Sequence, residues 1–176
     1  DLFSYQNTLF CGHDSGTFIV NETSANLIYA ASGTWKFVPS SEGSNLILQG
    51  NYNGISVLEK KNNTWFFRNK IKGFNYSSKH FEILNAKEIY VSHEYKGVYR
   101  FLVDDQLTTA SNIFKFKNPE KGKNATLAKY NNQIYYASKA GVFKMNNTTK
   151  AFEKDKSLSN MFQNDEYVTG KMIVDK

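Results

Sequence analysis

Four segments of the sequence repeat one pattern, in which an apolar run leads through a short polar turn to a glycine and then to a second apolar run. The turn glycines recur at intervals of roughly 40 residues, a spacing typical of repeated supersecondary units. The repeat predicts a chain built from similar structural units, and it constrains the fold more than any other feature. The segments are TLFCGHDSGTFIVNE, LILQGNYNGISVLEK, IYVSHEYKGVYRFLV and QIYYASKAGVFKMNN, with turn glycines Gly16, Gly54, Gly97 and Gly141.

The residues around each glycine predict a β-hairpin. Both apolar runs are rich in β-branched and aromatic residues and are too short for helices. The glycine is expected at positive φ in the tight turn that joins them. In the first run the apolar residues are consecutive, which predicts a strand buried on both faces. We therefore expect the following residues to be mostly buried: Leu9, Ile47, Tyr90, Ile134, Phe10, Leu48, Val91 and Tyr135.

Each hairpin is flanked by one more predicted strand on either side. Asn62-Asn63 precedes an apolar run containing Trp65, and Asn146-Asn147 precedes one containing Phe152. Because Asn tolerates left-handed turn conformations, both pairs predict a further turn and strand. Short apolar runs also precede the hairpins, in TWKFVPS, HFEIL and ATLAKYNN. The predicted unit thus has four antiparallel strands, A to D, and we expect Trp35 and Trp65 in its core rather than on a sugar-stacking surface.

Units of this kind cannot bury their own faces, and they stack radially as the blades of a β-propeller. A β-sandwich or barrel is the main rival, but it has no reason to place a glycine at the same point of every second hairpin. We therefore predict an all-β fold, a β-propeller portion of about four blades that begins and ends within blades. The region spans residues 1–176, with blade units near 1–30, 34–75, 79–117 and 124–157 and the start of a further blade at 166–176.

No catalytic or cofactor-binding motif is found in the sequence. The chain lacks HExxH, GxSxG, CxxC and phosphate-binding GxxxxGK[ST] patterns,. The stretch GHDSG (residues 12–16) contains the residue types of a nucleophilic triad, but adjacent side chains in a tight turn diverge and cannot converge as a triad requires. We therefore expect no enzymatic activity, no metal and no cofactor in this region.

The net charge of +6 raises the question of a nucleic-acid partner. Arginine, which reads guanine edges by paired hydrogen bonds, is present only at Arg68 and Arg100,. The lysines are scattered along the chain, as on a solvated surface. We expect no direct contact with nucleic acid.

Three of the repeats, YYASKAGVFKMN, ILQGNYNGISVLE and FCGHDSGTFIVN, resemble degenerate copies of a known propeller repeat. It is the short repeat in the extracellular sensor regions of bacterial two-component (hybrid histidine kinase) and helix-turn-helix regulators. The resemblance covers residues 8–155 and includes the turn glycine of all four copies. The inner Gly-Thr of the family is reduced to Gly12 and Gly50, and His93 and Ala137 replace it elsewhere. This departure leaves other propeller families open.

The resemblance implies an excerpt of a seven-bladed propeller. Its partners would be the remaining blades and the signalling domains of the same chain, and the full-length protein could form a homodimer. The location implied is the periplasm or the cell exterior, as the sensor region of a membrane-anchored protein.

The B–C turns of all blades in a propeller gather at one mouth of the central channel, together with the D-to-A connections. The residues just before each repeated glycine are therefore the candidate ligand contacts, and their aromatic, polar and charged groups suit a polar ligand such as an oligosaccharide. Two functions stay open, namely a non-catalytic sensor module and a structural or protein-interaction propeller. The candidate residues are His13, Asp14, Asn51, Tyr52, Glu94, Tyr95, Ser138 and Lys139.

Overall fold

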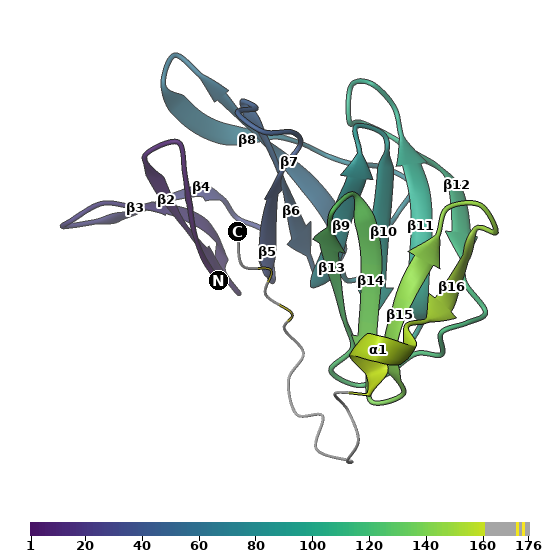
Figure 1. The fold of residues 1–176 in the computed structure, drawn as a ribbon. Coiled ribbons are helices and arrows are strands. Elements are labelled where there is room, and N and C mark those ends of the chain that lie inside the picture. The colour runs from purple at the N-terminus through teal and green to yellow at the C-terminus, as the bar shows by residue number, and fades with distance from the viewer. Residues whose placement is uncertain (161–171, 173, 175–176) are drawn as a thin grey trace. The chain divides into compact units, whose positions relative to one another are not determined.

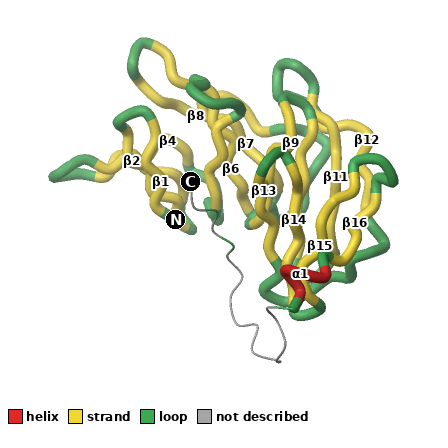
Figure 2. Tube along the Cα trace, in the orientation of Figure 1, coloured by secondary structure: helices red, strands yellow, loops and turns green. Residues whose placement is uncertain are grey.

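The computed structural model describes residues 1–160, 172 and 174. These residues form four sheets, each of four strands that follow one another in chain order, and Figure 2 shows that strands and turns make up almost all of the described chain. The predicted all-β class and four-stranded unit are confirmed. A helical turn, α1 (Lys156–Ser159), follows the last strand. The described part of the chain contains no helix long and apolar enough to span a membrane.

The four sheets are named I to IV in chain order (Figure 1). Sheet I contains β1 (Leu2–Tyr5), β2 (Thr8–His13), β3 (Gly16–Val20) and β4 (Ala25–Tyr29). Sheet II contains β5 (Lys36–Pro39), β6 (Leu46–Asn51), β7 (Gly54–Lys61) and β8 (Thr64–Lys70). Sheet III contains β9 (His80–Asn85), β10 (Glu88–His93), β11 (Gly97–Val103) and β12 (Ala110–Lys115). Sheet IV contains β13 (Thr126–Tyr130), β14 (Gln133–Ser138), β15 (Gly141–Asn146) and β16 (Ala151–Lys154).

All four repeated glycines begin strand C and take positive φ, as predicted. The φ values are 142° at Gly16, 120° at Gly54, 96° at Gly97 and 119° at Gly141. Each glycine pairs with the last residue of strand B: His13, Asn51, His93 or Ser138. The repeat read from the sequence is therefore a repeat of hairpin register.

Asparagine-rich turns close the opposite end of several sheets. Asn62 and Asn63 both adopt positive φ in the two-residue turn between β7 and β8, as expected. The second predicted Asn turn differs, because Asn146 still belongs to β15 and the left-handed residue of the longer turn is Lys150. The Oδ1 atom of Asn146 instead accepts hydrogen bonds from the backbone N–H groups that follow it, at 2.8 and 3.1 Å.

The expectation that the chain begins inside a blade is wrong for the first sheet. The strand β1 pairs with β2 along its whole length, so sheet I has all four strands. The segment LFSY is short, and its turn at Gln6 and Asn7 contains no glycine, so the repeat pattern did not reveal it. The further strand predicted at 166–176 lies almost wholly outside the described residues.

The chain forms two compact units. Unit 1 comprises residues 1–79 and 103–111, and unit 2 comprises residues 80–102 and 112–176. In unit 1, sheets I and II pack around a core in which the Phe10 and Trp65 rings meet edge to face at 5.4 Å between centroids. The loop 103–111 belongs to this unit because its backbone pairs with Lys72. The buried residues of the core are Phe10, Phe37, Ile47, Leu58 and Trp65.

Sheets III and IV pack together in unit 2. The Lys129 ammonium on β13 donates hydrogen bonds to the carbonyl oxygens of Ile83 and Leu84 at the end of β9, at 3.0 and 2.9 Å. These bonds tie one sheet to the other beside an aromatic and aliphatic core. The buried residues of this core are Tyr90, Val98, Phe116, Ala125, Leu127, Ile134, Tyr136, Met145 and Phe152.

Six of the eight residues predicted to be mostly buried are buried, and the exceptions are informative. Leu9 is 38% exposed and Tyr135 is half-buried. In β2 and β14, buried and more exposed residues alternate, whereas β6 and β10 are buried on both faces over most of their length. The β2 and β14 strands thus each have one face that the described residues leave partly uncovered.

Candidate ligand-binding residues at the B–C turns

All eight candidate residues lie at the B–C end of a sheet, as their spacing from the glycines requires. In unit 1 the connection between β4 and β5 bridges the two B–C turns. The Gly33 N–H donates to the Asp14 carbonyl at 3.2 Å, and the Tyr52 N–H donates to the Ser32 carbonyl at 3.4 Å. The turns containing His13-Asp14 and Asn51-Tyr52 are therefore neighbours.

The same arrangement recurs in unit 2. The Asn124 N–H, in the connection between β12 and β13, donates to the Glu94 carboxylate at 3.3 Å. On the other side of this connection, a Cβ added to Gly122 would lie only 3.1 Å from the Cβ of Ser138. The Glu94-Tyr95 and Ser138-Lys139 turns are thus held by one loop.

Several candidate side chains stabilise their own turns. The Nδ1 atom of His13 accepts a hydrogen bond from the Ser15 N–H at 3.1 Å, and Ser138 Oγ accepts one from the Ala140 N–H at 3.2 Å. Ser138 is also buried, with 3% of its surface exposed. The burial of Ser138 and its hydrogen bond within the turn support a role in turn formation rather than in ligand contact.

Asn51 is the clearest correction to the candidate set, because it is completely buried. Its Nδ2 atom donates to Thr34 Oγ1 at 3.1 Å, and its Oδ1 atom accepts from Gln49 at 3.4 Å. Thr17 Oγ1 completes the network by donating to Gln49 Oε1 at 2.8 Å. The network joins sheet I to sheet II, and its paired polar groups offset the cost of their burial.

We expect the variant Asn51→Ala to lower the free energy of unfolding by about 1 to 3 kcal/mol, because it leaves buried donors and acceptors unpaired. Chemical denaturation measures this change. Asn53→Ala, two residues along in the same turn and exposed, is the matched control and should stay within about 0.5 kcal/mol of the wild type. If Asn51→Ala also stays within about 0.5 kcal/mol of the wild type, the network does not stabilise the fold as predicted.

Tyr52 does fit a ligand-contact role. Its side chain is 48% exposed and meets the Trp35 ring edge to face, with 5.3 Å between ring centroids. A Cβ added to Gly33 would lie 2.2 Å from the Tyr52 ring, so the ring rests directly on the Gly33 backbone. The Lys79 ammonium stands 5.2 Å from the centroid of the Trp35 ring. We call Trp35, Tyr52 and Lys79 the aromatic site of unit 1.

Sequence reasoning missed Trp35 and Lys79 as members of this site. Trp35 was expected in the blade core with Trp65, but it lies just before β5 and is half-buried, whereas Trp65 is 2% exposed. Its position directly after Gly33 and Thr34, in a D-to-A connection rather than within an alternating strand pattern, was the available signal.

Sheet III contains a buried charged cluster at the end opposite its B–C turn, where β10 begins. Glu88 forms an ion pair with Arg100 and accepts a hydrogen bond from the Tyr90 hydroxyl at 2.8 Å. Burial would raise the pKa of Glu88, but the hydrogen bonds from Arg100 and Tyr90 and the Arg100 charge outweigh burial and lower it. The carboxylate is therefore held ionised by its partners, which favours a stabilising role.

This cluster predicts a pH-dependent contribution to stability. Because the pKa of Glu88 is lower in the folded state than its ordinary value of 4.5, the contribution is present above that value and is lost as the pH falls through the folded pKa,. Glu88→Gln should cost about 2 kcal/mol near neutral pH, since it leaves Arg100 without its partner. Unfolding measured against pH should show the variant and the wild type converging in acid. A constant difference down to the lowest pH would contradict this assignment.

Unit 1 has a hollow at the end opposite the B–C turns. Its volume is about 260 Å³, and it lies where the turn between β1 and β2 meets the turn between β7 and β8. The hollow is lined by Asn7, Thr8, Leu9, Ile19, Val20, Asn21, Asn63, Thr64 and Trp65.

Within residues 1–160, 172 and 174, no three His, Cys, Asp or Glu side chains are grouped as metal ligands would be.

Comparison with known proteins identifies the fold. No protein-family model matches the sequence, and no curated protein matches it. The structure is similar to apo AztD from Citrobacter koseri, a β-propeller protein, with a TM-score of 0.52 and 14% sequence identity over 87% of this chain and 44% of the AztD chain. A second structure of Citrobacter koseri AztD aligns with a TM-score of 0.49 and 13% identity, over 85% and 44% of the two chains.

The chain therefore spans less than half the length of the AztD chain that it resembles. Its four sheets correspond to half of that propeller, which confirms the predicted β-propeller portion. At this level of identity the likeness concerns the fold alone. A seven-bladed ring and membership of the sensor family stay predictions.

Proposed function

We propose that this chain is a non-catalytic binding module, part of the sensor propeller of a membrane-associated bacterial regulator, and that it responds to carbohydrate-type ligands. The observation that carries the proposal is the aromatic site of unit 1. Tyr52 and Trp35 present two rings at right angles at the B–C end, where the fold brings turns and connections together.

Sugars suit this geometry because their rings combine an apolar C–H face with a polar rim. An aromatic ring covers the apolar face, and neighbouring polar groups satisfy the hydroxyls. The indole nitrogen of Trp35 is buried without a hydrogen-bond partner among the described residues, as is that of Trp65 in the core. The two rings, rather than this nitrogen, therefore support the proposed sugar contact.

The regulator context and the location outside the cytoplasm rest on the repeat resemblance. Ligand binding at the B–C end would be transmitted through the remaining blades to signalling domains of the same chain. In this proposal, the full-length protein would act as a homodimer.

A protein-interaction propeller is the second candidate, and one observation favours it. The edge strand β12 carries Ile113 and Phe114, which are 45% and 51% exposed. Large apolar side chains on an edge strand are characteristic of surfaces that meet other proteins. Such a module would bind its partner at this edge and would not respond to sugars.

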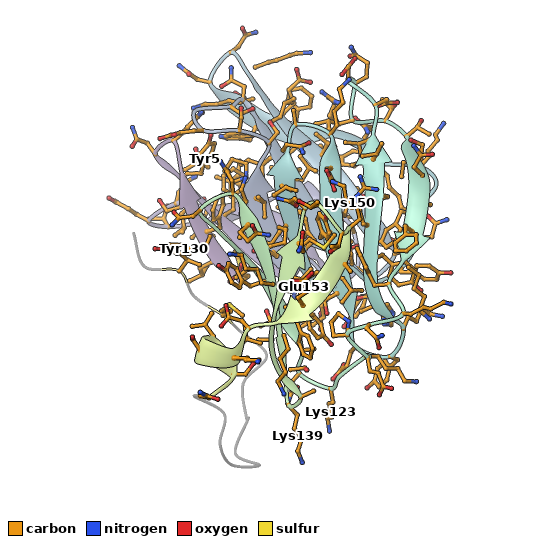
Figure 3. The ribbon with its side chains drawn as sticks, turned by 45° about the vertical axis from the view of Figure 1, so that its right-hand side comes forward. Tyr5, Lys123, Tyr130, Lys139, Lys150 and Glu153 are labelled. Atoms are coloured by element: carbon orange, nitrogen blue, oxygen red, sulfur yellow. The ribbon has the colours of Figure 1, made fainter. Side chains whose placement is uncertain are left out.

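The Trp35→Ala and Tyr52→Ala variants test the proposal. Each should weaken oligosaccharide binding about tenfold, which corresponds to roughly 1.4 kcal/mol of lost contact. Isothermal titration calorimetry measures the change. Tyr130→Ala is the matched control, because Tyr130 is 51% exposed and its turn between β13 and β14 lies at the other end of its sheet (Figure 3).

Two results would contradict the proposal. Unchanged affinity in the Trp35 and Tyr52 variants would remove the site. If chromatography shows that the purified chain cleaves the bound oligosaccharide, the module is an enzyme.

A further inference from the structure

The B–C end of unit 2 is lined by lysines. Lys121 and Lys123 lie on either side of Gly122, and Lys139 lies in the turn beside it. All three are exposed. Figure 3 shows the Lys123 and Lys139 side chains next to each other, pointing away from this end of the unit.

The backbone that carries these lysines is held in place by hydrogen bonds. The Tyr136 hydroxyl donates to the Glu120 carbonyl at 2.9 Å, and the Ala125 N–H donates to the Gly122 carbonyl at 3.1 Å. Together with the bond from the Asn124 N–H to Glu94, these contacts fix both ends of the loop. The ammonium groups therefore project from an ordered base.

A recurring contact brings further lysines to the same end. Lys154, the last residue of strand D in sheet IV, lies over the turn glycine, where a Cβ on Gly141 would be 2.9 Å from its Cε. Lys115, the last residue of strand D in sheet III, takes the same place over Gly97 at 3.8 Å. Because glycine has no side chain, the lysine stem can lie across the turn.

Acidic groups at this end are fewer than the lysines. Glu94 accepts the Asn124 N–H, and Asp155 accepts the Leu158 N–H at 3.0 Å. Glu120 is a further exposed carboxylate in the loop. Lys96, Lys115, Lys121, Lys123, Lys139 and Lys154 outnumber them, so the surface attracts anions.

We propose that this surface, which we call the lysine end of unit 2, binds an extended acidic polysaccharide. The inference rests on the proposed function only in taking carbohydrate as the ligand class. Lysine ammonium groups pair with single carboxylates or sulfates as point charges, which suits a polymer with one charge per sugar. Tyr95, whose side chain is 68% exposed, offers a ring for a sugar face in the same turn region.

Nucleic acid fits the surface less well. Both arginines are engaged elsewhere, Arg68 with Asn69 and Gln106, and Arg100 with Glu88. Paired guanidinium contacts to phosphate or to bases are therefore not offered at this end. Binding to nucleic acid or to anionic lipid is an alternative outcome of the test.

The test compares two double variants of the whole chain that change the net charge equally. Lys123→Gln/Lys139→Gln alters the lysine end, and Lys87→Gln/Lys150→Gln alters the A–B and C–D turns at the other end of unit 2, with Lys150 marked in Figure 3. Calorimetry with polygalacturonate at low salt should show about tenfold weaker binding for the first variant only, with a weaker salt dependence. Circular dichroism confirms that both variants fold.

Neutral dextran, a single-stranded oligonucleotide and phosphatidylglycerol vesicles complete the experiment. The proposal is overturned if both double variants lose affinity equally, or if the oligonucleotide or the vesicles bind while polygalacturonate does not. If polygalacturonate binding is lost in Trp35→Ala and Tyr52→Ala but not in the lysine variants, the proposed function survives and this inference fails.

Discussion

Replacing Gly54 by alanine should lower the free energy of unfolding by about 3 kcal/mol or more, from backbone strain and overpacking together. Gly54 has a φ of 120°, a backbone conformation that residues with a side chain rarely adopt,. In addition, a Cβ at this position would lie 2.4 Å from the Phe74 carbonyl oxygen, and backbone gives way less readily than a side chain. Urea denaturation followed by fluorescence measures the change.

Gly97→Ala is the control at the same position of the repeat. Its φ of 96° imposes similar strain, but the nearest atom to an added Cβ is Lys115 Cε at 3.8 Å. The loss should therefore be about 1 to 3 kcal/mol, from strain alone. Gly43→Ala, in open space at φ 68°, gives the cost of a left-handed alanine within unit 1. If Gly54→Ala costs no more than these two variants, the Phe74 carbonyl adds nothing to the cost, which contradicts the prediction.

Leu48→Ala should cost about 2 to 5 kcal/mol, as cavities in well-packed cores do. Leu48 is completely buried in β6, a strand whose two faces are both covered. Leu9→Ala removes the same atoms from the first run of the sheet I repeat, but Leu9 is 38% exposed, so its loss should be about 1 kcal/mol or less,. Chemical denaturation measures both losses, and equal losses would contradict the prediction that Leu48 is more deeply packed than Leu9.

The repeat made the fold predictable because backbone geometry, rather than side-chain identity, imposes it. A hairpin that must turn at positive φ requires glycine at one position, so Gly16, Gly54, Gly97 and Gly141 mark the register directly,. The β1 strand was not predicted, because the turn that follows it contains no glycine: Gln6 and Asn7 adopt the positive φ values there. The AztD likeness at 14% identity fits this view, since the two sequences share few residues while the fold is similar.

The candidate site was harder to predict, because neighbouring turn residues differ in the burial of their side chains. Asn51 is completely buried in the polar network, whereas the next residue, Tyr52, is 48% exposed. Spacing from the glycine places both at the B–C end but does not say which way each side chain turns. That depends on Thr34 and Gly33, which come from a connection between sheets and not from the hairpin itself.

The lysines of unit 2 show the same limit. In the sequence they look like scattered surface charge, because Lys123, Lys139 and Lys154 are far apart along the chain. Packing of Gly122 against Ser138, and of the Lys154 stem over Gly141, brings them to one end of the unit. Only the pairing of strands shows that strand D ends beside the turn between strands B and C.

The central claim is that ligands bind at the B–C end of the sheets. The most direct test is an NMR titration of the isotopically labelled chain with oligogalacturonate, followed through backbone amide shifts. We predict shifts confined to the B–C turns and the adjoining connections, at residues 13–15, 32–35, 52–53, 94–96, 121–124 and 139–140. Shifts centred instead on Asn7, Asn63 and Trp65 at the hollow, or on the turn containing Lys150, would contradict the claim.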